Sequence, residues 1–280
     1  NADQRLLTSV YGAYFDRDWW RQASTSTDCS SRDLSDCRVD GRLRNYTTMG
    51  IDSRWFGKHS ALGVQSELEA GIKLQSEIQK RRQERYADYA SFLNDVRNST
   101  IFMQENQDRR TQAISAFASN RMQISEKLTL TPILRVEHIR HERNFFATAS
   151  GTPNPSSADA TLTELVPGVG ATYQIDASKL LYGGVHRGFS PPRVEDTLIA
   201  SSGAATSVDL NSERSINAEL GLRSSQSANL FFDAAVFRND FSNLVQVGSI
   251  AGGSTAYSEG KALFQGVELA RSEEHTSELQ

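Results

Sequence analysis

Hydrophobic and polar residues alternate one by one in several separate stretches of the chain. Between Val64 and Ile78 most even positions are apolar, while the odd positions carry Gln, Glu and Lys side chains and one glycine. Because successive side chains of a β-strand point to opposite faces, this stretch predicts a strand with one apolar and one charged face. A helix would distribute the same charges around its whole circumference.

Further stretches show the same alternation, and connections of two kinds separate them. The other alternating stretches are residues 128–137, 164–176, 213–223 and 230–236. Short turns are predicted near residues 57–60, 125–127, 176–178 and 224–227. Long polar connections are predicted at 24–42, 84–108, 148–160, 191–211 and 248–255. Tight turns on one side and extended loops on the other are typical of an up-and-down membrane barrel, here with about ten strands.

The fold class predicted from this pattern is all-β, namely an antiparallel transmembrane β-barrel. The alternative is a soluble β-sandwich, because its strands alternate for the same reason. The length of the stretch 64–78 and its continuous charged face favour the barrel, whose lumen is filled with water. One helix is also expected, since Tyr89, Phe92, Leu93 and Val96 have helical spacing inside a predicted loop.

Composition narrows the possible functions. The chain has 280 residues, of which 38% are hydrophobic, and its formal net charge of −4 argues against a nucleic-acid partner. No apolar run approaches the length of a membrane-spanning helix.

The chain opens at Asn1 without the features of an export signal, and residues 271–280 read like a translated sequencing adapter. We therefore expect a barrel domain at residues 1–270 and a non-native tail at 271–280.

Candidate chemical motifs point to no enzymatic reaction. Cys29 and Cys37 are the only cysteines, and in an exported protein they predict a disulfide within a polar loop. His138 and His141 suggest a metal site, but on a strand their spacing places them on opposite faces, so none is predicted. The glycine-rich stretches lack the residues of a phosphate-binding loop, and no Gly-x-Ser-x-Gly elbow occurs.

Several ordered motifs resemble TonB-dependent outer-membrane receptors, and most of all the ferric-citrate and ferric-siderophore class. The stretch LLYGGVHRGFSPPR at residues 180–193 resembles the strand of this family that ends in Gly-Phe-x-x-Pro before an external loop. Further similar segments are LTLTP at 128–132, LRVE at 134–137, SERSINAELGL at 212–222, residues 231–243 and GVEL at 266–269. No stretch of the sequence resembles the family's plug, TonB box or terminal aromatic strand. The chain therefore resembles the middle of a barrel, and we expect an incomplete, open curved sheet whose first and last strands do not pair.

The resemblance implies TonB-energised uptake of a ferric chelate across the outer membrane of a Gram-negative bacterium. Its partners would be the chelate, outer-membrane lipid and, through the missing plug, the TonB complex, with no cofactor of its own. Ferric-citrate-like ligands are anionic, so basic side chains near the external strand ends are candidate contacts, unless they only line a solvated rim. These candidates are Arg140, Arg143, His186, Arg187 and Arg193. Two alternatives stay open, namely a passive porin-like or structural barrel and an outer-membrane barrel enzyme.

Overall fold

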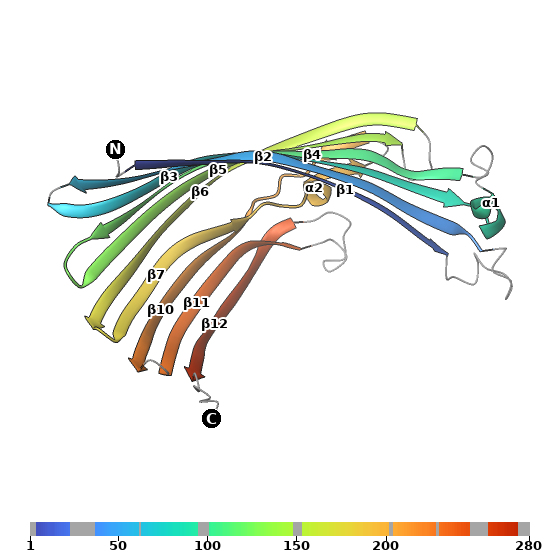
Figure 1. The fold of residues 1–280 in the computed structure, drawn as a ribbon. Helices are drawn as coiled ribbons and strands as arrows, with labels where there is room; N and C mark the ends of the chain where they lie inside the picture. Colours follow the sequence, from blue (N-terminus) through green and yellow to red (C-terminus); the bar gives the residue numbers. More distant parts are fainter. Residues whose placement is uncertain are drawn as a thin grey trace, which may run out of the picture.

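A computed structural model of the chain forms one long antiparallel sheet (Figure 1). The described residues are 4–22, 37–61, 63–94, 101–147, 153–201, 204–227, 230–246 and 257–273. The strands of the main sheet are β1 (Gln4–Gln22), β2 (Val39–Ala61), β3 (Val64–Tyr86), β4 (Ile101–Gln123), β5 (Leu128–Ala147), β6 (Pro153–Asp176), β7 (Lys179–Ser190), β10 (Glu213–Ser227), β11 (Leu230–Gln246) and β12 (Tyr257–Glu273). The remaining elements are α1 (Tyr89–Leu93), α2 (Val194–Thr197), β8 (Leu198–Ser201) and β9 (Ala204–Ser207).

Each strand of the main sheet pairs with the next one along the chain, except that β7 pairs with β10 across an insertion. The insertion holds α2 and a separate two-stranded sheet, β8–β9. Within the described residues β1 and β12 are the two edges of a ten-stranded sheet that curves without closing (Figure 1). This confirms the predicted fold class, an open all-β barrel segment. In the described part of the chain, neither short helix is long and apolar enough to cross a membrane.

The two faces of the sheet differ in polarity as the alternation predicts. Cross-strand partners share a face, and one such row joins Val10, Ile51, Leu74 and Ile114, all of them exposed. We call the side of this row the outer face, and the opposite side, which carries Lys73, the inner face. The buried hydrophobic side chains among the described residues are few and scattered: Cys37, Val39, Tyr86, Ile139, Phe145, Leu198 and Ala235. The apolar faces therefore do not form the dry core of a sandwich.

Two of the four predicted short turns are confirmed, and polar side chains explain both. In the turn before β5, the backbone N–H groups of Lys127 and Leu128 donate to Ser125 Oγ. In the turn after β6, the backbone N–H and hydroxyl of Ser178 both donate to Asp176 Oδ1, each at 2.8 Å. These bonds replace the strand pairing that ends at each reversal.

The short turns predicted near 57–60 and 224–227 exist but lie a few positions later, because the strands run past both predicted positions. The strand β2 continues to Ala61, and the reversal contains Gly63, whose φ of 78° lies in the left-handed region that favours glycine. The strand β10 continues to Ser227. Gly57 instead makes room for a side chain, since a Cβ atom there would lie 2.3 Å from Cη2 of the Trp55 ring.

The predicted loops are shorter than expected, because the strands extend into them. The strand β6 begins at Pro153, and the connection around α1 runs only from β3, which ends at Tyr86, to β4, which begins at Ile101. The helix α1 confirms the expected helical stretch, with Ser91 N–H donating to the capping Asp88 carboxylate at 2.6 Å, while Val96 lies outside the described residues. At the other end of the chain, β12 extends to Glu273 and so into the predicted tail.

The loop before β2 is described only from Cys37 onward. Cys37 is buried and disulfide-bonded, in agreement with its predicted role. Its predicted partner Cys29 and the predicted loop at 248–255 lie outside the described residues.

The polarity of the two faces predicts effects of different size when a charge is placed on neighbouring residues of β4. We expect Ile114→Arg, on the outer face where Ile114 is 53% exposed, to destabilise the protein in phospholipid vesicles by about 2–4 kcal/mol. The matched variant Ala113→Arg places the same charge on the inner face and should have a much smaller effect. The folded fraction of each variant across a urea series measures this, and equal losses would contradict the assignment of the faces.

Candidate functional site

Arginine side chains gather on the inner face near the ends of the strands that carry the long loops. The pairing places Arg17, Arg44 and Arg81 opposite one another on β1, β2 and β3. The partner of Arg81 on β4 is Gln107. Two positions farther along β4, toward its short turn, Arg109 pairs with Arg143 of β5. All five arginines lie an even number of positions from Lys73 or its cross-strand partners, so they share the inner face.

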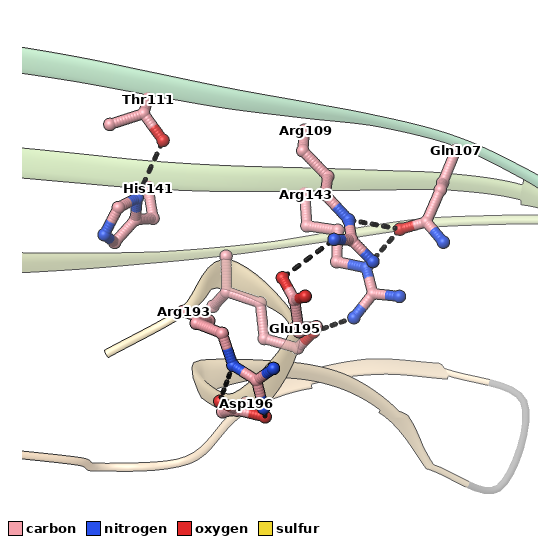
Figure 2. A network of polar contacts seen from close by, with 9 residues as sticks. Gln107, Arg109, Thr111, His141, Arg143, Arg193, Glu195 and Asp196 are labelled. Atoms are coloured by element: carbon pink, nitrogen blue, oxygen red, sulfur yellow. Dashed lines mark hydrogen bonds and ion pairs between the residues drawn. The ribbon is translucent and has the colours of Figure 1, made fainter. Parts of the chain in front are cut away.

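The insertion between β7 and β10 folds back over part of this surface (Figure 1). Arg109 Nη1 donates to Glu195 Oε2 of α2 at 2.8 Å, and Arg143 Nη1 donates to the Leu198 carbonyl (Figure 2). The Gln107 side-chain carbonyl accepts from the Nε atoms of both arginines. The Leu198 side chain is fully buried. Two arginines from adjacent strands therefore hold the segment that contains α2 and β8.

The charges around Glu195 keep it ionised. Partial burial raises the pKa of Glu195. Its own backbone N–H and the guanidinium groups of Arg109, Arg193 and Arg81 together lower the pKa by more than burial raises it, so the net shift is downward. The Arg109 side chain is only 8% exposed, whereas that of Glu195 is 38% exposed. Arg193, at the N-terminus of α2, donates to both carboxylate oxygens of Asp196, at 2.7 and 3.0 Å, and this pairing raises the pKa of Arg193.

A buried histidine lies beside the arginine pair. His141 is two positions from Arg143 on the inner face of β5, is 5% exposed, and forms a hydrogen bond through Nδ1 to Thr111 Oγ1 at 2.9 Å (Figure 2). Its Nε2 atom is buried and has no hydrogen-bond partner. His138 lies on the outer face against Thr163, so the predicted placement of the two histidines on opposite faces is confirmed.

A second ionic cluster marks the place where β6 and β7 separate. Their pairing ends at Gly168 and His186. Just beyond it, the carboxylate of Glu164, which is 4% exposed, accepts from Arg187 Nη2 at 2.9 Å and from Arg214 Nη2 at 2.8 Å. Buried charges are stable only when they are paired in this way. These ion pairs join β6 to β7 and β10 where backbone pairing between β6 and β7 has ended.

The structure brings only two of the predicted ligand-contact residues into one site. Arg143 holds the α2 segment directly, and Arg193 belongs to it. Arg187 is engaged with Glu164, while His186 lies on the inner face opposite Gly168. Arg140 lies on the outer face, with its Nη2 atom 3.7 Å from a carboxylate oxygen of Asp159.

Sequence reasoning missed Gln107, Arg109 and Glu195. Gln107 was placed in a predicted loop, although Arg109, Thr111 and Ser115 continue the polar alternation of β4. Glu195 meets Arg109 across 86 positions of sequence, and no local pattern indicates that contact.

Comparisons with known proteins agree with this architecture. The family model described as "TonB dependent receptor-like, beta-barrel" matches residues 1–276. No curated protein matches the sequence. Among solved structures, the ferric-catecholate import receptor Fiu of E. coli K12 superposes with a TM-score of 0.72 and 14% identity over 99% of this chain and 43% of Fiu.

Two further solved structures are similar in the same way. The siderophore receptor PiuA of Acinetobacter baumannii has a TM-score of 0.74 and 16% identity over 99% of this chain and 43% of PiuA. The unliganded ferric citrate transporter FecA has a TM-score of 0.68 and 17% identity over 97% of this chain and 37% of FecA. The chain thus spans well under half the length of these proteins, and at such identities the likeness concerns the fold.

The attachment of the α2 segment should depend on pH through Glu195. Because the folded state lowers the pKa of Glu195, the stabilising contribution is fully present above the usual pKa of a glutamic acid and is lost as pH falls through the lowered value. Hydrogen exchange of the amides of Val194–Ser201, corrected for intrinsic rates, should therefore accelerate on acidification. In Glu195→Gln it should already be fast at neutral pH. Parallel acid profiles in both proteins would contradict this assignment.

Removal of the Glu164 carboxylate should weaken the junction of β6 with β7 and β10. Glu164→Ala leaves Arg187 and Arg214 partly buried without their shared partner, and the expected loss is about 3 kcal/mol or more. Glu142→Ala, on the outer face of β5, is the matched control and should cost much less. The free energy of unfolding in lipid vesicles measures both, and equal losses would refute the role of Glu164.

Proposed function

The chain belongs to the TonB dependent receptor-like β-barrel family, and on this premise we propose that it is part of an outer-membrane receptor that takes up a ferric chelate. The chelate would be a siderophore or ferric citrate, and its transport would be energised by the TonB complex acting through a plug domain. Iron would arrive inside the ligand, so the receptor needs no cofactor of its own.

The observation that carries the proposal is the set of arginines on the inner face near the long loops. Guanidinium groups bind carboxylates and other oxyanions through paired, charge-assisted hydrogen bonds. Arg109 and Arg143 already present such donors to a carboxylate and a carbonyl of the α2 segment. An anionic chelate in the lumen would meet groups of this kind before it reached the membrane-embedded part of the barrel.

The structural neighbours support the same class of ligand. Fiu is an import receptor for ferric catecholates, FecA is a ferric citrate transporter, and PiuA is a siderophore receptor. The apolar outer face fits a surrounding of outer-membrane lipid, and the charged inner face fits a hydrophilic cargo. A passive porin-like barrel would share both faces but would not depend on TonB. A barrel enzyme would release a chemically altered ligand.

The positions of the residues proposed from the sequence favour some of them over others as ligand contacts. Arg143 and Arg193 are retained, because both lie beside the segment that contains α2 and β8, close to the inner-face arginines. His186 and Arg187 remain candidates farther along β7. Arg140 points to the outer side of the sheet, where a ligand in the lumen would not reach it.

Uptake of labelled iron by cells that express the full-length receptor tests the proposal. We expect uptake from ferric citrate or a ferric siderophore that disappears when TonB is deleted. Arg143→Gln should lower uptake about tenfold, as the loss of charge-assisted hydrogen bonds implies. Arg110→Gln, on the outer face of the neighbouring strand, is the matched control and should transport normally. Uptake that persists without TonB would favour the porin-like alternative, and a degraded ligand would favour the enzyme.

A further inference from the structure

We infer that Arg109, Arg143 and Gln107 form a binding site for a polycarboxylate anion, and that Glu195 occupies this site as an internal competitor until the ligand displaces it. The inference deepens the proposed function and rests on it, because it names both the groups that would bind the ligand and the ligand chemistry they favour.

The geometry of the arginine pair is that of a prepared oxyanion site. The Nε atoms of both guanidinium groups donate to the same oxygen of Gln107, which fixes the two groups beside each other. Each arginine then directs an Nη1 donor away from the sheet, one to the Glu195 carboxylate and the other to the Leu198 carbonyl (Figure 2). Both acceptors belong to the α2 segment, so this segment takes the place that ligand oxygens would fill.

The exposure of the two partners makes exchange feasible. Arg109 is buried beneath the segment, while the Glu195 side chain keeps 38% of its surface open to solvent. A carboxylate from solution can therefore approach beside Glu195 and compete for Arg109. The buried Nε2 atom of His141, which has no hydrogen-bond partner, lies two positions away on the same face and is a further polar group available to a bound anion.

Several carboxylates on one ligand suit this surface better than one. Arg81 of β3 is close enough to lower the pKa of Glu195, and Arg44 and Arg17 continue the row on β2 and β1. Neighbouring strands are about 4.8 Å apart, so a ligand with several carboxylates can reach arginines on more than one strand. Glu195 supplies a single carboxylate, which a polycarboxylate can outcompete by binding several guanidinium groups at once.

The α2 segment can leave without disturbing the barrel wall. The β8–β9 hairpin forms its own two-stranded sheet and is not part of the ten-stranded one. The ion pair of Arg193 with Asp196 lies within the segment itself and involves no residue of the main sheet. The side-chain bonds from Arg109 and Arg143 and the burial of Leu198 hold α2 and the start of β8 on the inner face, while β9 lies against β6.

Citrate binding to the purified full-length receptor, measured by titration calorimetry with and without bound iron, tests this inference. Glu195→Gln keeps the size of the side chain but removes its charge, so we expect citrate to bind about tenfold more tightly than to the wild type. Arg109→Gln should bind citrate at least about tenfold more weakly. Glu142→Gln removes a carboxylate from the outer face of β5 and should match the wild type.

A second measurement follows the segment itself. Saturating citrate should accelerate hydrogen exchange at the amides of Val194–Leu198 in the wild type, while Glu195→Gln should exchange rapidly with or without citrate. The inference is overturned if Glu195→Gln binds citrate no more tightly than the wild type, if neither protein binds citrate, or if citrate leaves the exchange unchanged.

These outcomes can be distinguished from a failure of the proposed function. A receptor that takes up another ferric chelate in a TonB-dependent manner but shows no citrate effect would retain the proposed function and lose this site. A receptor that gains citrate affinity in Glu195→Gln yet transports no iron would retain the site and lose the proposed function.

Discussion

The structure depends first on the hydrogen-bonded pairing between neighbouring strands. In a membrane no water is available to the backbone, so each strand must find its partners in the strands beside it. The register provides these partners and also keeps the apolar side chains of neighbouring strands on the same face, as in the row of Val10, Ile51, Leu74 and Ile114. A slip of one residue would turn every apolar side chain of a strand inward and every charge outward. Within the described residues the outer edges of β1 and β12 have no neighbouring strand, and their free backbone groups are available for pairing.

The register also determines where charge collects. Because side chains two positions apart lie on the same face, the polar positions of β1 to β5 carry their arginines to one region of the inner face. Where β6 and β7 separate, backbone pairing no longer joins them, and Glu164 joins them instead through Arg187 and Arg214. The arginine cluster is therefore placed by the strand register, whereas the Glu164 cluster forms where the register between β6 and β7 ends.

Alternation was sufficient to predict β3, β5, β6, β10 and β11 and their faces, because the 2-residue period of a strand is visible in the sequence itself. The open sheet was expected from the resemblance to a larger barrel. The turns were harder to predict. Gly57 suggested a reversal, but it serves as space for the Trp55 ring within a continuous strand. Of the candidate site, Arg143 and Arg193 were found from their positions near strand ends. Glu195 was not, since its contact with Arg109 joins segments 86 residues apart and depends on how an insertion folds back onto the sheet.

The barrel wall and the α2 segment are held by different interactions, and this difference explains why their responses should differ. The wall is a ladder of backbone hydrogen bonds, whose strength does not depend on the ionisation of any side chain. The segment lies outside this ladder, and a carboxylate on a guanidinium is a main part of what fixes it. Protons and competing anions act on that contact directly, and on the wall only through ion pairs such as those of Glu164. An insertion held in this way can move when an anion binds to the arginines beneath it, while the strands that carry these arginines stay in place.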